Sequence, residues 1–153
     1  LRPRRQRQMC IRDRYKIDCK IIDHKNYNDR EEYDGLINSY LENLNPDLIV
    51  LAGYMRIMSK SLVDNWEGQI VNIHPSLLPK YPGLNTHKRA LEAKDKTHGS
   101  TIHFVTSELD SGPIIRQESF EIEPSDTEES LINKVKDLEH KIYPETISIL
   151  IKQ

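Results

Sequence analysis

The sequence predicts one α/β domain built on a largely parallel sheet. Segments typical of strands alternate along the chain with segments whose apolar residues recur at helical spacing, which is the pattern of α/β proteins. Leu48–Ala52 is continuously apolar, as expected for a central parallel strand covered on both faces. At 153 residues, the chain is long enough for a single domain with a substantial core.

The first half of the chain is expected to hold two strands and two helices. Ile17–Asp23 alternates apolar and polar residues and predicts a short strand. Asn28 or Asp29 can cap a helix that runs to about Leu44 and buries one apolar stripe, made of Tyr33, Leu36, Ile37, Tyr40, Leu41 and Leu44. After the strand at Leu48–Ala52, Ser59 can cap a short helix that runs through Trp66.

The second half is expected to hold three strands and two helices. The strands are predicted at Gln69–Ile73, Ser100–Val105 and Pro113–Ile122, and a short helix at Thr86–Ala93. The last helix starts near Pro124–Thr127, where Ser125 and Glu128 have the spacing of a capping box. Pro144 is expected to kink or break this helix, because proline cannot donate the internal hydrogen bond.

The bulk composition excludes several classes of protein. A net charge of −2 and a pI near 6.3 give no general attraction to nucleic acid or membrane. No apolar run reaches the roughly 20 residues that span a bilayer. The two cysteines and the histidines have no convincing metal-ligand spacing, so we expect no metal, and a cytoplasmic, reducing location is the default expectation.

The N-terminal residues 1–14 have a different character from the rest of the chain. They contain six arginines and no apolar periodicity, and could be taken for a basic nucleic-acid arm or a transit peptide. Arg4 to Arg14, however, back-translate without a gap to a string that looks like a transposase-type sequencing adapter. Our hypothesis is that residues 1–14 are non-native and that residues 15–153 form a partial catalytic domain.

The most informative motif is Asn72-Ile73-His74 at the end of a predicted strand, followed by a loop that contains Pro75, Pro79 and Pro82. Residues two apart in a strand point to the same side, so the amide of Asn72 and the imidazole of His74 should project together. An amide can donate to a developing oxyanion, and an imidazole can exchange protons near neutral pH. The alternative is a strand-end amide beside an interior histidine, which we consider less favoured here.

Two more residues are candidates for the same site. Asp110 lies in a turn sequence, Asp-Ser-Gly-Pro, and on its own is best read as an ordinary turn residue. It gains importance only if it faces His74, where a carboxylate would stabilise the imidazolium form. His103 lies in the middle of a predicted strand, where a structural role and a supporting role behind the site are equally compatible with the sequence.

Four segments together resemble the phosphoribosylglycinamide formyltransferases, which use folate in purine synthesis. They are LAGYMRIMS (51–59), NIHPSLLPKYPGL (72–84), HGSTIHFVTSELDSGPII (98–115) and LEHKIYP (138–144). The resemblance spans about Tyr15 to Ile151. It implies a doubly wound formyltransferase-type sheet flanked by helices, and 10-formyltetrahydrofolate and glycinamide ribonucleotide as small-molecule partners. It implies no metal, nucleic-acid or membrane partner, and a monomer or homodimer.

The resemblance also implies roles for matching residues. The catalytic set would be Asn72, His74 and Asp110, with His103 behind them. Pro75 and Glu139 would contact the glycinamide substrate. The folate site would be lined by Arg30, Met55, Arg56, Ile57, Met58, Thr106, Ser107, Glu108, Leu109 and Asp110.

The front of the chain departs from this family, because nothing matches its first strand and its phosphate-binding, glycine-containing loop. We therefore expect the first strand-loop-helix unit to be missing and the substrate site of this chain to be impaired. Two other hypotheses stay open. One is a formyltetrahydrofolate hydrolase with the same fold, in which water replaces the amine. The other is a non-enzymatic α/β binding module with a basic arm.

Overall fold

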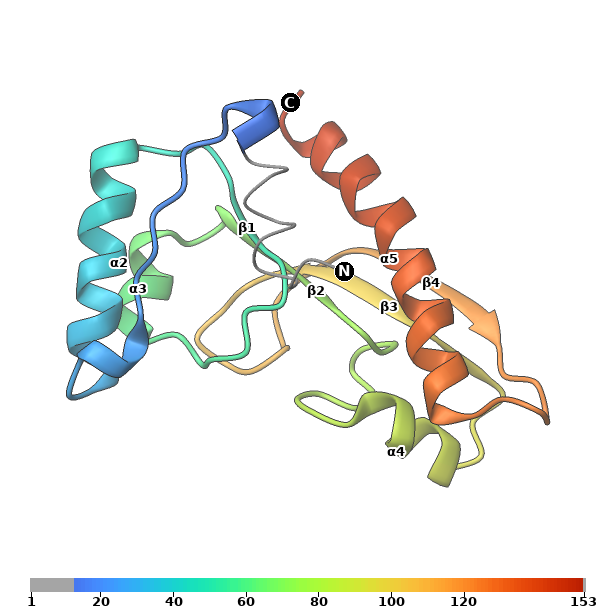
Figure 1. The fold of residues 1–153 in the computed structure, drawn as a ribbon. Helices are drawn as coiled ribbons and strands as arrows, with labels where there is room; N and C mark the ends of the chain where they lie inside the picture. The colour runs from blue at the N-terminus through green and yellow to red at the C-terminus, as the bar shows by residue number, and fades with distance from the viewer. Residues whose placement is uncertain (1–12, 153) are drawn as a thin grey trace.

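The computed structural model describes residues 13–152 and shows a four-stranded sheet between helices (Figure 1). The hypothesis that residues 1–14 are non-native falls almost entirely outside this range. The elements, in chain order, are η1 (His24–Asn26), α2 (Arg30–Leu44), β1 (Ile49–Leu51), α3 (Lys60–Asn65), β2 (Ile70–His74), α4 (Thr86–Glu92), β3 (Thr97–Phe104), β4 (Ile114–Glu121) and α5 (Glu128–Leu150).

The sheet is mixed rather than largely parallel. Its strands lie in the order β1-β2-β3-β4; β1 and β2 are parallel, whereas β2 with β3 and β3 with β4 are antiparallel. The prediction of a largely parallel sheet was therefore wrong for the described part of the chain. The pattern of strands and helices could not reveal this, because a connection that contains a helix can return the chain in either direction.

Helices cover the two faces of the sheet, so the α/β class is confirmed (Figure 1). On one face, Leu62 and Trp66 of the α3 region pack with Ile70 of β2, and partly buried residues of α2 join them. On the other face, Ile142 and Tyr143 of α5 pack against Val71 and Ile102. Ile70 and Val71 are adjacent in β2 and point to opposite faces, which explains why both are buried.

The helices α2 and α3 begin where the sequence predicts. Asp29 has an extended backbone, and its side chain accepts a hydrogen bond from the Glu32 N–H, which satisfies one of the free donors at the start of α2. Ser59 caps α3 in the same way through the Leu62 N–H. The predicted stripe on α2 is only partly buried, since the side chains of Leu36 and Leu44 are exposed.

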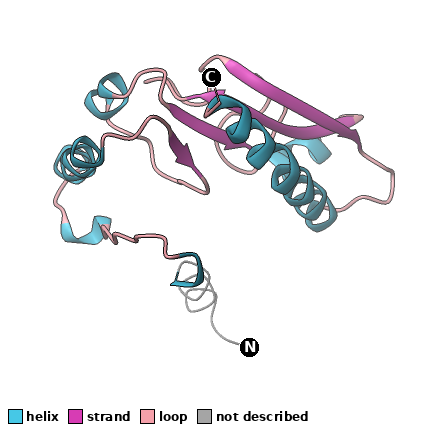
Figure 2. Cartoon of the chain, turned by 90° about the horizontal axis from the view of Figure 1, so that it is seen from above, coloured by secondary structure: helices cyan, strands magenta, loops and turns pink. Residues whose placement is uncertain are grey.

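The first predicted strand is absent from the described sheet. Ile17–Asp23 forms no strand of this sheet, and Ile17 and Ile21 are exposed; Figure 2 shows this segment as a loop that leads to α2. A strand needs a neighbour to receive its backbone hydrogen bonds, and alternation alone does not supply one. For the same reason, the prediction that Leu48–Ala52 is central was wrong within residues 13–152, where β1 is at the sheet edge and Val50 is exposed.

The last helix has a different N-cap from the predicted one and is not broken at Pro144. Thr127, rather than Ser125, is the N-cap, and Thr127 and Ser130 form the capping box through each other's backbone N–H. Pro144 lies inside α5, which continues to Leu150. The helix is held on both sides of Pro144 by its buried face, which contributes Ile142, Tyr143 and Thr146 to the core.

Candidate active site at the end of strand β2

Side chains from two adjacent strands and one loop meet beside the end of β2. Asn72 in β2 lies directly opposite His103 in β3, and Asp110 approaches from the loop between β3 and β4. The Nδ1 atom of His74 lies 3.4 Å from one Asp110 oxygen, and Nε2 of His103 lies 3.8 Å from the other. The structure therefore brings together Asn72, His74, His103 and Asp110, and Asp110 does face His74.

Both ring nitrogens of His74 face oxygen acceptors. Nε2 lies 2.9 Å from the Tyr81 carbonyl oxygen, and Nδ1 faces the Asp110 carboxylate. Each ring nitrogen therefore has an oxygen acceptor within reach to which its N–H can donate. The His74 side chain is buried, and it lies behind Asp110 rather than in the wall of the neighbouring pocket.

Asp110 ties two loops together. Its Oδ2 atom accepts a hydrogen bond of 2.8 Å from the Gly83 N–H at the end of the proline loop. Its backbone is left-handed, with φ of 50°, a conformation that aspartate tolerates better than most residues. The turn chemistry recognised in the sequence therefore serves to turn this carboxylate inward, toward His74 and His103.

His103 orients the amide of Asn72. The His103 Nδ1–H donates to the Phe104 carbonyl at 2.9 Å, which leaves Nε2 free to accept from the Asn72 Nδ2 atom at 3.4 Å. Burial lowers the pKa of His103, although the Phe104 carbonyl and Asp110 act in the opposite direction, so the ring is neutral and can play this part. One amide N–H of Asn72 then remains available for a ligand.

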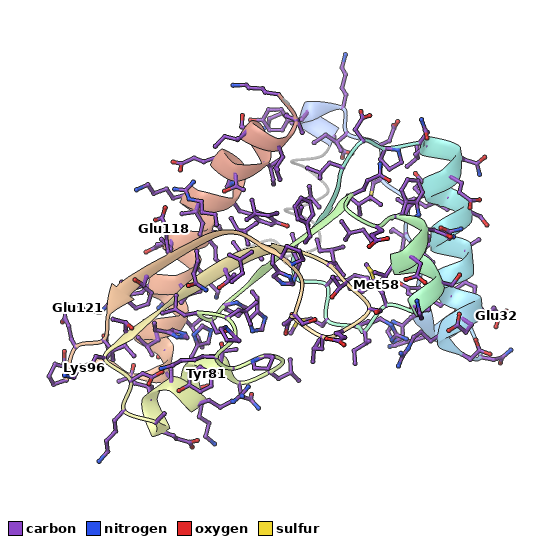
Figure 3. The ribbon with its side chains drawn as sticks, turned by 180° about the vertical axis from the view of Figure 1, so that it is seen from behind. Glu32, Met58, Tyr81, Lys96, Glu118 and Glu121 are labelled. Carbon is purple, nitrogen blue, oxygen red and sulfur yellow. The ribbon has the colours of Figure 1, made fainter. Side chains whose placement is uncertain are left out.

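A cavity of about 90 Å³ opens beside Asn72, His103 and Asp110. Its walls come from the loop after β1 and the loop after β3; Figure 3 labels Met58, which belongs to the first of these loops. Most residues expected at a folate site line it, namely Arg56, Ile57, Met58, Thr106, Ser107, Glu108, Leu109 and Asp110.

Besides His74, four expected site residues do not line this cavity. Met55 is largely exposed, Arg30 is the first residue of α2, and Pro75 is half-buried in the loop after β2. Glu139 of α5 lies on the other side of β3, where it accepts a hydrogen bond of 3.0 Å from the Ser100 hydroxyl. Burial raises the pKa of Glu139, although the Ser100 bond partly opposes this.

The sequence reading missed four lining residues, Leu51, Tyr54, Val63 and Val105. Among the described residues, the Tyr54 hydroxyl and Asp34 Oδ1 are the buried side-chain atoms without a hydrogen-bond partner. Burial, with help from the charge of Asp34, raises the pKa of Tyr54 to about 12, so the hydroxyl keeps its proton. Tyr54 follows Gly53 at the end of a strand, and this position was the sequence signal that could have identified it as a site residue.

The start of the proline loop is fixed by two polar residues of the sheet. The Leu78 N–H donates to the Thr101 hydroxyl oxygen at 3.1 Å, and that hydroxyl donates to the Ser76 carbonyl at 2.7 Å. Gln117 of β4 donates to the Leu78 carbonyl at 2.9 Å. The peptide bond between Leu78 and Pro79 is cis. The loop is therefore held by hydrogen bonds as well as by its prolines.

Within residues 13–152, no group of three or more histidine, cysteine, aspartate or glutamate side chains could hold a metal ion. In the same part of the chain, every helix is too short or too polar to cross a membrane.

Comparison with known proteins gives a consistent answer. The sequence profile of the formyl transferase family matches residues 4–147. The chain is 48% identical over 122 residues to the phosphoribosylglycinamide formyltransferase of Escherichia coli K12, covering 80% of this chain and 58% of that protein. It is 45% identical over 138 residues to the trifunctional purine biosynthetic protein adenosine-3 of Gallus gallus, covering 90% of this chain and 14% of that protein.

Solved structures agree. The phosphoribosylglycinamide formyltransferase of Coxiella burnetii superposes with a TM-score of 0.86 at 44% identity, over 92% of this chain and 66% of that one. The enzyme of the same name from Bacillus halodurans gives a TM-score of 0.87 at 42% identity, over 92% and 73%. The chain thus spans little more than half of the E. coli relative and a small part of the chicken one. On sequence and on fold, the chain belongs to the formyl transferase family.

Proposed function

We propose that the protein from which this chain comes transfers the formyl group of 10-formyltetrahydrofolate to the amine of N1-(5-phospho-D-ribosyl)glycinamide, a step of purine synthesis. The observation that carries the proposal is the cavity that ends at Asn72, His103 and Asp110, with His74 directly behind. Two relatives named phosphoribosylglycinamide formyltransferase, from E. coli and Haemophilus influenzae, are each 48% identical to the chain.

The reaction needs an amide donor where negative charge develops. The substrate amine attacks the formyl carbon, and its lone pair forms the new C–N bond while the C=O electrons move onto the oxygen. We propose that the remaining N–H of Asn72 donates to that oxygen, since its other N–H is already engaged by His103. When the carbonyl re-forms, the bond to the folate nitrogen breaks, and the amine proton ends on that nitrogen.

His74 and Asp110 supply charge and a path for protons. His74 is buried, and its Nδ1 atom lies 3.4 Å from the Asp110 carboxylate, so a protonated His74 would add a positive charge that stabilises the oxyanion. Asp110 lies between His74 and the cavity, so its carboxylate is the group best placed to receive the amine proton and pass it on. In this arrangement, His74 acts through Asp110 unless it exchanges its Tyr81 bond for one to the substrate.

The two substrates would reach this centre from opposite sides of the β2–β3 pair. The cavity lined by Arg56–Met58 and Thr106–Asp110 is the proposed folate site. Glu139, whose carboxylate lies near the main chain of His74 through Ser100, is the proposed contact for the glycinamide substrate. Pro75 is proposed to contact the same substrate, whereas Arg30 and Met55 are proposed to contact folate only beyond the cavity. A cytoplasmic location and a monomeric or dimeric state stay predictions.

Formyl transfer and hydrolysis can be separated by supplying 10-formyltetrahydrofolate with and without glycinamide ribonucleotide. The proposal expects deformylation only when the amine is present. Turnover at the same rate without the amine would favour a hydrolase. As a mechanistic check, His74→Ala should lower the rate at least about 100-fold if the imidazolium stabilises the transition state; a near-normal rate would overturn the role given to His74.

A further inference from the structure

The far end of the proline loop is fastened to the region around α4 by a cluster of charged and aromatic side chains. The Tyr81 hydroxyl donates to Asp95 Oδ2 at 2.8 Å, and the Lys80 ammonium lies 3.0 and 3.1 Å from the two Asp95 oxygens. Arg89 of α4 stacks over the Tyr81 ring at 5.0 Å and donates to the Pro82 carbonyl at 2.7 Å. Asp95 is central to this cluster, since its carboxylate binds the side chains of both Tyr81 and Lys80.

Tyr81 connects this cluster to the catalytic histidine. Its hydroxyl end binds Asp95, while its backbone carbonyl is the acceptor for His74 Nε2 at 2.9 Å. Figure 3 labels Tyr81 in the loop that follows β2. Its backbone is left-handed, with φ of 57°, which costs about 1 kcal/mol or more for a residue with a side chain. Such a conformation persists only where the surrounding contacts hold it.

The Asp95 carboxylate is held in its charged form by the side chains around it. The Asp95 side chain is only 17% exposed. Burial opposes its negative charge, but the hydrogen bonds from Lys80 and Tyr81 outweigh burial and hold the pKa of Asp95 below its ordinary value. A partly buried carboxylate with two donors forms stronger bonds than an exposed ion pair, so its removal should loosen the loop.

We propose that Asp95 is a positioning residue for His74, because it fixes the Tyr81 peptide whose carbonyl holds the His74 ring. Asp95 touches neither the cavity nor Asp110, and acts through the loop alone. The inference deepens the proposed function and rests on it only where turnover is measured. The position of the His74 ring can be tested without any activity.

The direct test is the exchange with water of the His74 Nε2–H proton, measured by NMR on protein labelled with ¹⁵N-histidine and assigned with His74→Gln. Asp95→Ala and Tyr81→Phe should each speed this exchange about tenfold or more, as expected for the loss of a charge-assisted hydrogen bond. Asp95→Asn keeps an acceptor for the Tyr81 hydroxyl and should show a smaller change. Glu92→Ala breaks the exposed Lys88–Glu92 pair on α4 and serves as the matched control.

Turnover provides the second measurement. If the proposed function is correct, Asp95→Ala should lower kcat about tenfold and leave the KM for the formyl donor within about twofold, because the cavity wall is untouched. If the parent chain shows no formyl transfer, the proposed function is in question, while the exchange result still decides the positioning role. Exchange of His74 Nε2–H within twofold of the parent in both Asp95→Ala and Tyr81→Phe would overturn the proposal. So would an equal rise in the amide exchange of core residues such as Val71.

Discussion

Gly112 offers a sharp test of how tightly the loop after β3 is packed. A methyl group added at Gly112 would lie 1.8 Å from the Phe104 carbonyl oxygen and 2.8 Å from its carbon, far inside contact distance. Both are backbone atoms, so the clash cannot be relieved by rotating a side chain. Gly112→Ala must therefore push the loop and the end of β3 apart by more than an ångström.

The destabilisation expected for Gly112→Ala can be compared with the effect of the same substitution at Gly35. Overpacking of this kind is expected to destabilise the fold by about 1–3 kcal/mol. Gly35 lies in α2, is exposed, and has nothing within 4 Å of an added methyl group. Gly35→Ala should therefore stabilise the helix by about 0.5–1 kcal/mol. The same chemical change should thus have opposite signs at the two positions.

The assay is urea unfolding followed by the fluorescence of Trp66, the single tryptophan, which is 7% exposed in the core. Gly112→Ala should lower the unfolding midpoint and Gly35→Ala should raise it, with similar slopes. Gly112→Ala should also reduce turnover, because the displaced Phe104 carbonyl holds the His103 ring that orients Asn72. Stability of Gly112→Ala equal to or above that of the parent would refute the steric reasoning.

Three further predictions concern the core, acid stability and the amide. Tyr143→Phe removes a hydroxyl bonded to the Leu51 and Val71 carbonyls at 2.7 and 3.1 Å and should cost about 1 kcal/mol in urea unfolding; no change would show that the bond is not formed. Burial lowers the pKa of His98 to about 4 from an ordinary 6.5, so the unfolded chain takes up the proton first. Its share of stability is full above pH 6.5 and is lost toward pH 4 by at most about 1.4 kcal/mol per pH unit. His98→Gln should flatten the stability profile between these values, and an unchanged slope would contradict the burial argument. Asn72→Ala should lower the rate of formyl transfer about 100- to 1000-fold with folding intact, and loss of less than tenfold would argue against an oxyanion donor.

Local signals determined a large part of the fold. The starts of α2 and α3 follow from caps, and the position of α4 from helical spacing, and these signals depend on residues within a few positions of one another. The same-side placement of Asn72 and His74, and the stiff loop after them, also follow from local geometry. The N-cap at Thr127 was misjudged because a specific pair of side chains decided it, and α5 continues past Pro144 because packing along the helix supports it.

Only the tertiary structure decided which distant residues meet. The direction of β3, the edge position of β1 and the loop conformation of Ile17–Asp23 depend on which strands find partners, and no short window of sequence encodes that choice. The contact of Asp110 with His74, the neutral His103 beside Asn72, and the tie from Asp95 through Tyr81 to His74 likewise arise only when separate loops are packed together. The sequence determined the chemical groups of the site, and folding determined their arrangement, because hydrogen bonds between distant residues have no signature in local spacing.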